Sequence, residues 1–452
     1  MLHDKEYLTN LIKIVLPITF QNFISASLNA IGVLMIGQLG DTSVAAVGLA
    51  NQVFFLFSLM LFGITSGSAI FTAQYWGSQN LPDIRKITLL CLSLTLATGT
   101  FFTIIAIGFP QAVMRLYTPD PAVIKLGSDY LQIIGISYLP TAISFTLASQ
   151  LRSTGNVRPP MMVSVIALSL GSLLNYALIF GKFGMPMMGV SGAALGTCLA
   201  RLVECIAILL VTYFGHFPTA ARLTDFKGSG RKLLTQYTVI VLPVAANETI
   251  WALGITIYNM IYARIGTQAI AAINITSTID SLAFVIFIGL SNASAIMIGN
   301  RIGAGEEKKA ILYARRALVL GISLALVVGA LVLLFSNVIL SLYNISETAA
   351  VDAKGILIVL MCSLSIRVTN MIMIAGILRS GGDTWFAMVL DICTVWLVGI
   401  PMALLGTFVF HLPVYWVVTM VLADEITKFV GGLYRFRSRK WINNLAHSMQ
   451  VG

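Results

Sequence analysis

The chain has 452 residues, of which 58% are hydrophobic and only 10% charged, and its mean hydropathy is +0.90. About a quarter of the residues of a soluble domain are charged, so this composition excludes a soluble fold and predicts an all-α integral membrane protein. The net charge of +10 is spread between apolar segments. That placement favours a role in membrane orientation and argues against nucleic acid as a partner.

Twelve apolar runs follow one another along the chain, and each is long enough to cross a hydrocarbon core of about 30 Å. Each run is predicted to be one transmembrane helix. The first six lie near 11–37, 46–74, 87–109, 126–150, 161–180 and 190–214. The second six lie near 236–263, 270–298, 313–336, 352–378, 385–409 and 414–434.

The basic residues between these runs predict the orientation of the chain. With the N-terminus in the cytoplasm, the inner segments hold 20 of the 28 Lys and Arg residues and the outer loops hold five. Cytoplasmic loops carry the excess of Lys and Arg in membrane proteins. We therefore expect both termini on the cytoplasmic side of a plasma (inner) membrane, with membrane lipid around the helices.

An internal repeat divides the chain in two. A shift of 226 residues superposes Leu16-Pro17 on Leu242-Pro243 and Ser68-Ala69-Ile70 on Ser294-Ala295-Ile296. After one inserted residue, Leu151-Arg152-Ser153 meets Leu378-Arg379-Ser380. Each copy has six helices, an even number, so the second copy enters the membrane from the same side as the first. This predicts parallel repeats and two pseudo-symmetric six-helix bundles. The expected domains are a lobe at 1–214, a cytoplasmic connector at 215–235, a second lobe at 236–440 and a cytoplasmic tail at 441–452.

Several short motifs recur in order along the chain, among them Gln74-Tyr75-Trp76-Gly77, Leu151-Arg152-Ser153-Thr154-Gly155, Asn175-Tyr176-Ala177-Leu178-Ile179-Phe180-Gly181 and Leu378-Arg379-Ser380-Gly381-Gly382-Asp383-Thr384. By these stretches the chain resembles the multidrug and toxic compound extrusion (MATE) family along nearly its whole length. The resemblance implies a V-shaped pair of bundles that exports organic cations in exchange for inward protons or sodium. No cofactor other than the coupling ion is expected.

Three acid positions of the family are not acidic in this chain. Gly32, Asn175 and Val368 stand where many relatives have an acid, whereas Glu248 matches the acid of the seventh helix. The resemblance therefore implies that the cation site of the first lobe is absent.

Ionisable residues inside spans cost several kcal/mol, so each is a candidate functional group. Glu248 lies about 12 residues into its helix, after Pro243, and is the first candidate for ion coupling, with Na⁺ as a possible ligand. Asp280 and Asp391 are candidate helpers. A carboxylate that holds either a proton or a cation, but not both, is the simplest chemical basis of antiport. A purely structural role in contacts with neighbouring helices is the alternative for each.

Other residues within spans are candidates for structure or for substrate binding. Arg201 and Glu204 are three residues apart on one helix and are expected to pair with each other. Arg367 is expected either to pair with Glu248 or Asp280 or to contact an anionic substrate. The resemblance implies that Asn22, Asn175 and Asn274 face the cavity, and an adaptable apolar lining is expected from Met35, Phe54, Phe55, Trp251 and Tyr258.

These features predict a secondary active multidrug efflux transporter that works by alternating access, most simply as a monomer. One alternative is a lipid-linked oligosaccharide flippase of the same superfamily, which usually has 14 spans and a more basic cavity. Another is an intramembrane enzyme, but the acids are scattered and the motifs of metalloproteases, P-loops and serine hydrolases are absent from the sequence. The five cysteines show no metal-ligand spacing.

Overall fold

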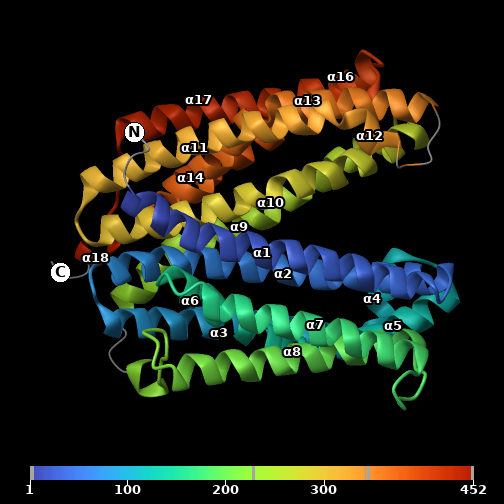
Figure 1. Cartoon of the computed structure of the whole chain (residues 1–452), viewed down its shortest axis with the longest axis horizontal. Helices are drawn as coiled ribbons and strands as arrows, with labels where there is room; N and C mark the ends of the chain where they lie inside the picture. Colours follow the sequence, from blue (N-terminus) through green and yellow to red (C-terminus); the bar gives the residue numbers. More distant parts are fainter. Residues whose placement is uncertain (1–4, 227–229, 342, 344–346, 449–452) are drawn as a thin grey trace. The chain divides into compact units, whose positions relative to one another are not determined.

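The computed structural model describes residues 5–226, 230–341, 343 and 347–448. In this part of the chain all regular structure is helical, as the composition predicted (Figure 1). A helix satisfies its own backbone hydrogen bonds, which is required wherever lipid replaces water. The chain divides into two compact units, which are described separately below.

The first unit comprises Leu16–Val241 and is called the N unit. Its helices α2, α3 and α6 pack side by side, as do α7 and α8 (Figure 1). The elements that lie in it wholly or partly are α1 (Lys5–Gly37), α2 (Asp41–Gly77), α3 (Leu81–Gly108), α4 (Pro110–Tyr117), α5 (Pro121–Gly135), α6 (Tyr138–Ser153), α7 (Arg158–Phe180), α8 (Gly189–Phe214), η1 (Leu223–Phe226) and the start of α9 (Arg231–Ala263).

The second unit comprises Met1–Val15 and Leu242–Gly452 and is called the C unit. Helix α13 packs against α10, α11 and α17. Besides the start of α1 and most of α9, the unit contains α10 (Thr267–Gly303), α11 (Glu307–Leu334), α12 (Ser336–Ser341), α13 (Glu347–Met371), η2 (Ile372–Leu378), α14 (Thr384–Thr394), η3 (Val395–Gly399), α15 (Ile400–Leu404), η4 (Leu405–Val409), α16 (Val414–Val421), α17 (Ala423–Ser438) and α18 (Leu445–Ser448).

The boundary between the units differs from the boundary expected from the repeat. The start of α1 belongs to the C unit, and the start of α9 belongs to the N unit. The division falls after Val15 in α1 and after Val241 in α9, two residues before Pro17 and Pro243. Both helices are continuous through their proline. The sequence did not predict this exchange, since it depends on which unit each helix start packs against.

The structure supports fewer continuous spans than the twelve expected. By length and composition, ten helices of the described residues are candidate spans, or eleven when α5 and α6, which are bent by 50° at their break, count as one. The twelfth expected span, at 414–434, is formed by α16 and α17 with Leu422 between them. Asp424, Glu425 and Lys428 lie in that stretch and make it more polar than the other spans.

The internal repeat is visible in the helix lengths. Helices α1 and α9 have 33 residues each, α2 and α10 have 37, and α3 and α11 have 28. The first residues of each pair lie 226 positions apart. The glycines before α2 and α10 are also equivalent, since Gly40 and Gly266 have φ values of 95° and 153°. A side chain is strained in such a conformation, which explains why glycine stands at both positions.

The residue inserted in the second copy coincides with a local change of helix type. In the C unit, α13 continues into the π-helical segment η2, which ends at Leu378, where the offset between the copies has become 227. A π-turn is the usual way for a helix to accommodate one extra residue. The equivalent stretch of the N unit is the bent pair α5 and α6. The insertion therefore sets the register of Arg379, the residue after η2.

Charged side chains close the turn between α10 and α11. Glu306 accepts hydrogen bonds from Lys309 and Arg301, at 2.7 and 2.6 Å. These cations lower the pKa of the Glu306 carboxyl below its usual value. Arg301 also reaches Glu6 at 3.3 Å, which ties the start of α1 to the C unit.

Candidate functional site

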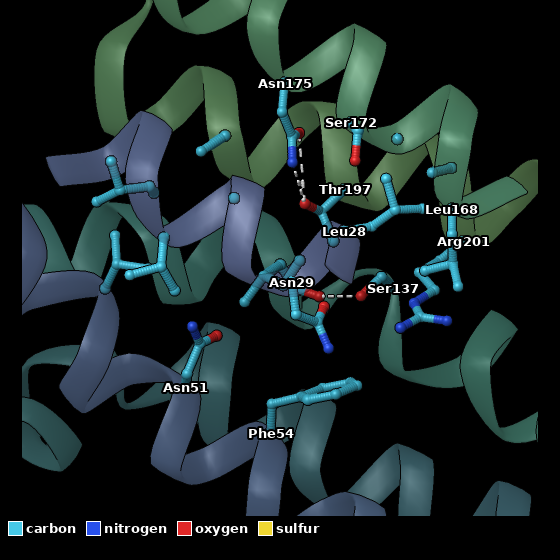
Figure 2. Close-up of a pocket in the computed structure, with 18 of the residues that line it drawn as sticks. Leu28, Asn29, Asn51, Phe54, Ser137, Leu168, Ser172, Asn175, Thr197 and Arg201 are labelled. Atoms are coloured by element: carbon cyan, nitrogen blue, oxygen red, sulfur yellow. Dashed lines mark hydrogen bonds between the residues drawn. The ribbon is translucent and has the colours of Figure 1, made fainter. Parts of the chain in front are cut away.

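A cavity of about 410 Å³ lies inside the N unit. Its walls come from α1, α2, α5, α7 and α8 and are mainly apolar, with a few polar groups that face the space (Figure 2). Mixed linings of this kind are typical of sites for small organic ligands. The polar lining residues are Asn29, Asn51, Ser137, Ser172, Asn175, Thr197, Arg201 and Glu204.

The two charges of this cavity neutralise each other. Arg201 donates to Glu204 at 2.8 Å, as the spacing on one helix predicted. Glu204 also accepts a hydrogen bond from Ser164 at 2.8 Å. The guanidinium carbon of Arg201 lies 5.9 Å from the centre of the Phe54 ring. The cavity therefore offers an aromatic face and an internally compensated ion pair to a ligand.

Asn175 lines this cavity, and it exchanges hydrogen bonds with Thr197 at 3.2 and 3.4 Å (Figure 2). Close packing of α7 on α8 brings the two side chains together. Gly196 lies so close that an added Cβ would come within 2.3 Å of the Asn175 amide oxygen. An amide in place of an acid leaves this wall of the cavity uncharged.

The three candidate coupling acids all lie in the C unit, and each is held by a basic residue. Glu248 of α9 accepts a hydrogen bond from Arg379 at 2.7 Å. The side chains are 14% and 7% exposed, respectively. Buried charges persist in proteins when they are paired in this way. Arg379 follows η2, so the inserted residue positions the partner of Glu248.

Asp280 of α10 forms a bidentate pair with Arg367 of α13. The two guanidinium nitrogens donate to the two carboxylate oxygens at 2.8 and 2.7 Å. The Arg367 guanidinium also lies over the Phe284 ring, 4.7 Å from its centre. Of the partners considered for Arg367, the structure selects Asp280.

Asp391 of α14 belongs to a larger group around one lysine, which we call the Lys428 cluster (Lys428, Asp391, Asp424 and Glu425). The Lys428 ammonium lies 3.1 Å from Asp391, 3.6 Å from Asp424 and 3.5 Å from Glu425. Two asparagines donate hydrogen bonds to two of these three acids. Asn247 donates to Asp391 at 3.0 Å and Asn370 donates to Glu425 at 2.6 Å.

The remaining expected binding residues do not gather at one place. Asn22 and Met35 of α1 are half-buried and do not line the cavity of the N unit, where Met35 packs against the hydrophobic core. In the C unit, Asn274 is exposed and Trp251 is 38% exposed. Tyr258 is buried, and its hydroxyl donates to Asp424 at 3.4 Å.

Sequence reasoning missed four residues of these groups: Arg379, Lys428, Asp424 and Glu425. Arg379 stands in an expected inner segment, so nothing in the local sequence connected it with Glu248. The Lys428 cluster had a detectable signal, because Asp424 and Glu425 precede Lys428 by four and three residues on one helix. The contribution of Asp391 from another helix had no such signal.

Two units of long apolar helices, one with a ligand-sized cavity and one with buried ion pairs, define an integral membrane protein of the transporter class. Comparison with known proteins gives the family. The MatE family model matches residues 17–177 and 243–405, two matches that begin 226 residues apart. The chain belongs to the MatE family, whose members are transporters and not enzymes.

Curated relatives and solved structures agree with this assignment. The chain is 24% identical to "Probable multidrug resistance protein NorM" of Thermotoga maritima, covering 96% of this chain and 93% of the relative. It is 28% identical to the Rhizobium meliloti protein of the same name, covering 82% and 81%. Its fold matches a MOP superfamily transporter from Pyrococcus furiosus with a TM-score of 0.85, 20% identity and 95% coverage of both chains.

Proposed function

We propose that this protein is a secondary active efflux transporter of the inner membrane, exporting small organic molecules, organic cations among them, in exchange for H⁺ or Na⁺. Alternating access would expose the bound molecule first to one side of the membrane and then to the other. Several relatives that the chain matches are named multidrug resistance proteins, including PmpM of Pseudomonas aeruginosa at 22% identity. Their names support a broad range of organic substrates.

We propose that the C unit binds the coupling cation and the N unit binds the substrate. The observation that best supports this separation is that the candidate coupling acids Glu248, Asp280 and Asp391 all lie in the interior of one unit. Ionisable groups are kept at such positions mainly where ions or substrates pass. The cavity of the N unit, with Phe54 and Asn175 in its walls, is the proposed substrate pocket. Coupling requires that cation binding and substrate binding favour different states of the protein.

Reconstitution in liposomes tests this proposal. Export of ethidium, an organic cation, should follow an imposed pH gradient or sodium gradient and stop when the gradient is collapsed. Transport that is indifferent to both gradients would reject the antiport mechanism. A fluorescence titration of ethidium on the detergent-solubilised protein tests binding separately from movement.

Glu248 provides the first variant. Glu248→Gln should reduce ion-driven export at least tenfold, because Arg379 is left as a buried cation without its partner. The double variant Glu248→Gln/Arg379→Gln removes both charges and separates the two roles. If Glu248 itself carries the coupling cation, the double variant stays inactive. Recovery of export would instead show that the ion pair of Glu248 and Arg379 has a structural role.

A further inference from the structure

The Lys428 cluster differs from the other buried ion pairs in its charge balance. Three carboxylates surround one ammonium, so the fully ionised group carries a surplus of two negative charges. The side chains of Lys428 and Asp424 are only 5% and 6% exposed. A buried charge without compensation is too costly to persist, and in practice such a group takes up a proton or another cation.

No other described base near the cluster supplies the missing charge. Arg367 interacts electrostatically with Glu425 and Asp424, but both of its terminal nitrogens are bound to Asp280. The charges of Arg367 and Asp280 cancel, so including both residues leaves the surplus at two negative charges. Among the described residues, the hydroxyls of Tyr258 and Tyr262 also interact with Asp424, and they are neutral hydrogen-bond donors.

The pairs Glu248–Arg379 and Asp280–Arg367 have one base for each acid. Their charges cancel without any further ion, and protonating either acid would leave an arginine unpaired in the interior. Charge balance therefore favours the Lys428 cluster over these pairs as the place that holds an exchangeable cation.

Two asparagines provide an independent indication that this site lacks a donor. Asn247 and Asn370 are 2% and 3% exposed and give their amide hydrogens to Asp391 and Glu425. The amide oxygen of each has no hydrogen-bond partner among the described residues. Buried acceptors are normally satisfied, and a carboxyl group that gains a proton gains an O–H donor.

We propose that the Lys428 cluster is the proton site of this transporter, with at least one proton shared among Asp391, Asp424 and Glu425. This assignment rests on the proposed antiport function and narrows it to one site and one ion. A proton fits better than a sodium ion because the ammonium already occupies the space between the carboxylates. In keeping with this, no group of three or more His, Cys, Asp or Glu side chains among the described residues is arranged so that it could hold a metal ion.

Each member has a distinct part in this site. Glu425 has the most exposed carboxylate of the three, at 22%, and in this proposal it is the group that takes up the proton. The proton binds to Glu425, is shared with Asp424 and Asp391 around Lys428, and is released when alternating access opens the site to the other side of the membrane. Lys428 stays charged and keeps the remaining carboxylates ionised.

The double variant Asp424→Asn/Glu425→Gln tests the site without leaving a buried charge unpaired, because Lys428 keeps Asp391 at 3.1 Å. Liposomes containing this variant should lose at least 90% of ethidium export driven by a pH gradient. Ethidium affinity in detergent should change less than threefold. The matched control is Asp383→Asn/Arg435→Gln, which removes an ion pair of 2.6 Å elsewhere in the C unit and should keep export.

A second measurement does not depend on transport. In weakly buffered detergent solution, the wild-type protein should take up about one more proton per chain than the double variant as the pH is lowered from 9 to 5. An equal proton uptake, or a variant that retains export driven by the pH gradient, overturns the proposal. Export driven by sodium alone also overturns it. Failure of the wild-type protein to transport under any gradient would reject the antiport function, while the proton count would still decide the site.

Discussion

At the scale of single residues, the chemistry of the C unit is set by which base reaches which acid. Arg379, Arg367 and Lys428 each bind a different candidate acid, at 2.7, 2.7 and 3.1 Å. The first two bases meet one acid each, whereas Lys428 meets three. This difference in charge balance, and not burial, separates the two one-to-one ion pairs from the proposed proton site.

The pair of Asp280 and Arg367 should be important for stability. Arg367→Gln would leave the carboxylate of Asp280 in the interior without its partner, a change that costs about 3 kcal/mol or more. We expect a clearly lower thermal unfolding midpoint in detergent. Asp280→Asn/Arg367→Gln should recover most of the loss, since no unpaired charge remains, and a double variant as unstable as the single one would contradict this explanation.

At the scale of helices, small residues and inserted residues decide how the elements meet. Helices α7 and α8 approach closely at Gly192, where an added Cβ would lie 2.6 Å from the backbone oxygen of Leu178. Small residues at such crossings are the main way in which membrane helices gain packing contacts. In the C unit, the π-turn of η2 gives the second copy a register that the first copy lacks.

Gly192→Ala should therefore destabilise the N unit. The methyl group meets backbone atoms that cannot rotate away, so α7 and α8 must separate, at a cost of about 1–3 kcal/mol. Thermal unfolding monitored by circular dichroism in detergent measures the effect. Gly108→Ala is the control, since a Cβ there has nothing within 4 Å, and its unfolding midpoint should stay within a degree or two of the wild type.

At the scale of the whole molecule, the duplication is evident in both sequence and structure. The two copies share helix lengths and glycine turns, yet the three candidate coupling acids, Glu248, Asp280 and Asp391, all lie in the second. Position 22 of the first copy is asparagine where position 248 of the second is glutamate. The orientation of the chain in the membrane is a separate property, which is predicted from the basic residues between the spans.

The predicted orientation can be checked with single cysteines added after replacement of the exposed Cys362 and Cys393 by serine. With both termini inside, a cysteine at Ser438, at the end of α17, should react with a membrane-impermeant maleimide only after the cells are opened. A cysteine at Met187, which is 78% exposed in the loop before α8, should react in intact cells. The reverse pattern would contradict the orientation.

The local sequence was sufficient for features that depend on composition and short spacing. Low charge content predicts membrane helices because lipid must replace water as the solvent. The offset of 226 residues predicts the duplication, and a spacing of three residues predicts the pair of Arg201 and Glu204 because both lie on one helix face. The helical class, the membrane location and the family are all confirmed.

Only the tertiary structure decided the partners of Glu248, Asp280 and Asp391, the exchange of helix beginnings between the units, and the place of the cavity. Each of these joins residues on different helices, many positions apart in the chain. Their contacts depend on helix rotation, which a single inserted residue at η2 changes by about 100°. The sequence determined which charges the membrane-spanning helices contain, and helix packing determined which of those charges cancel.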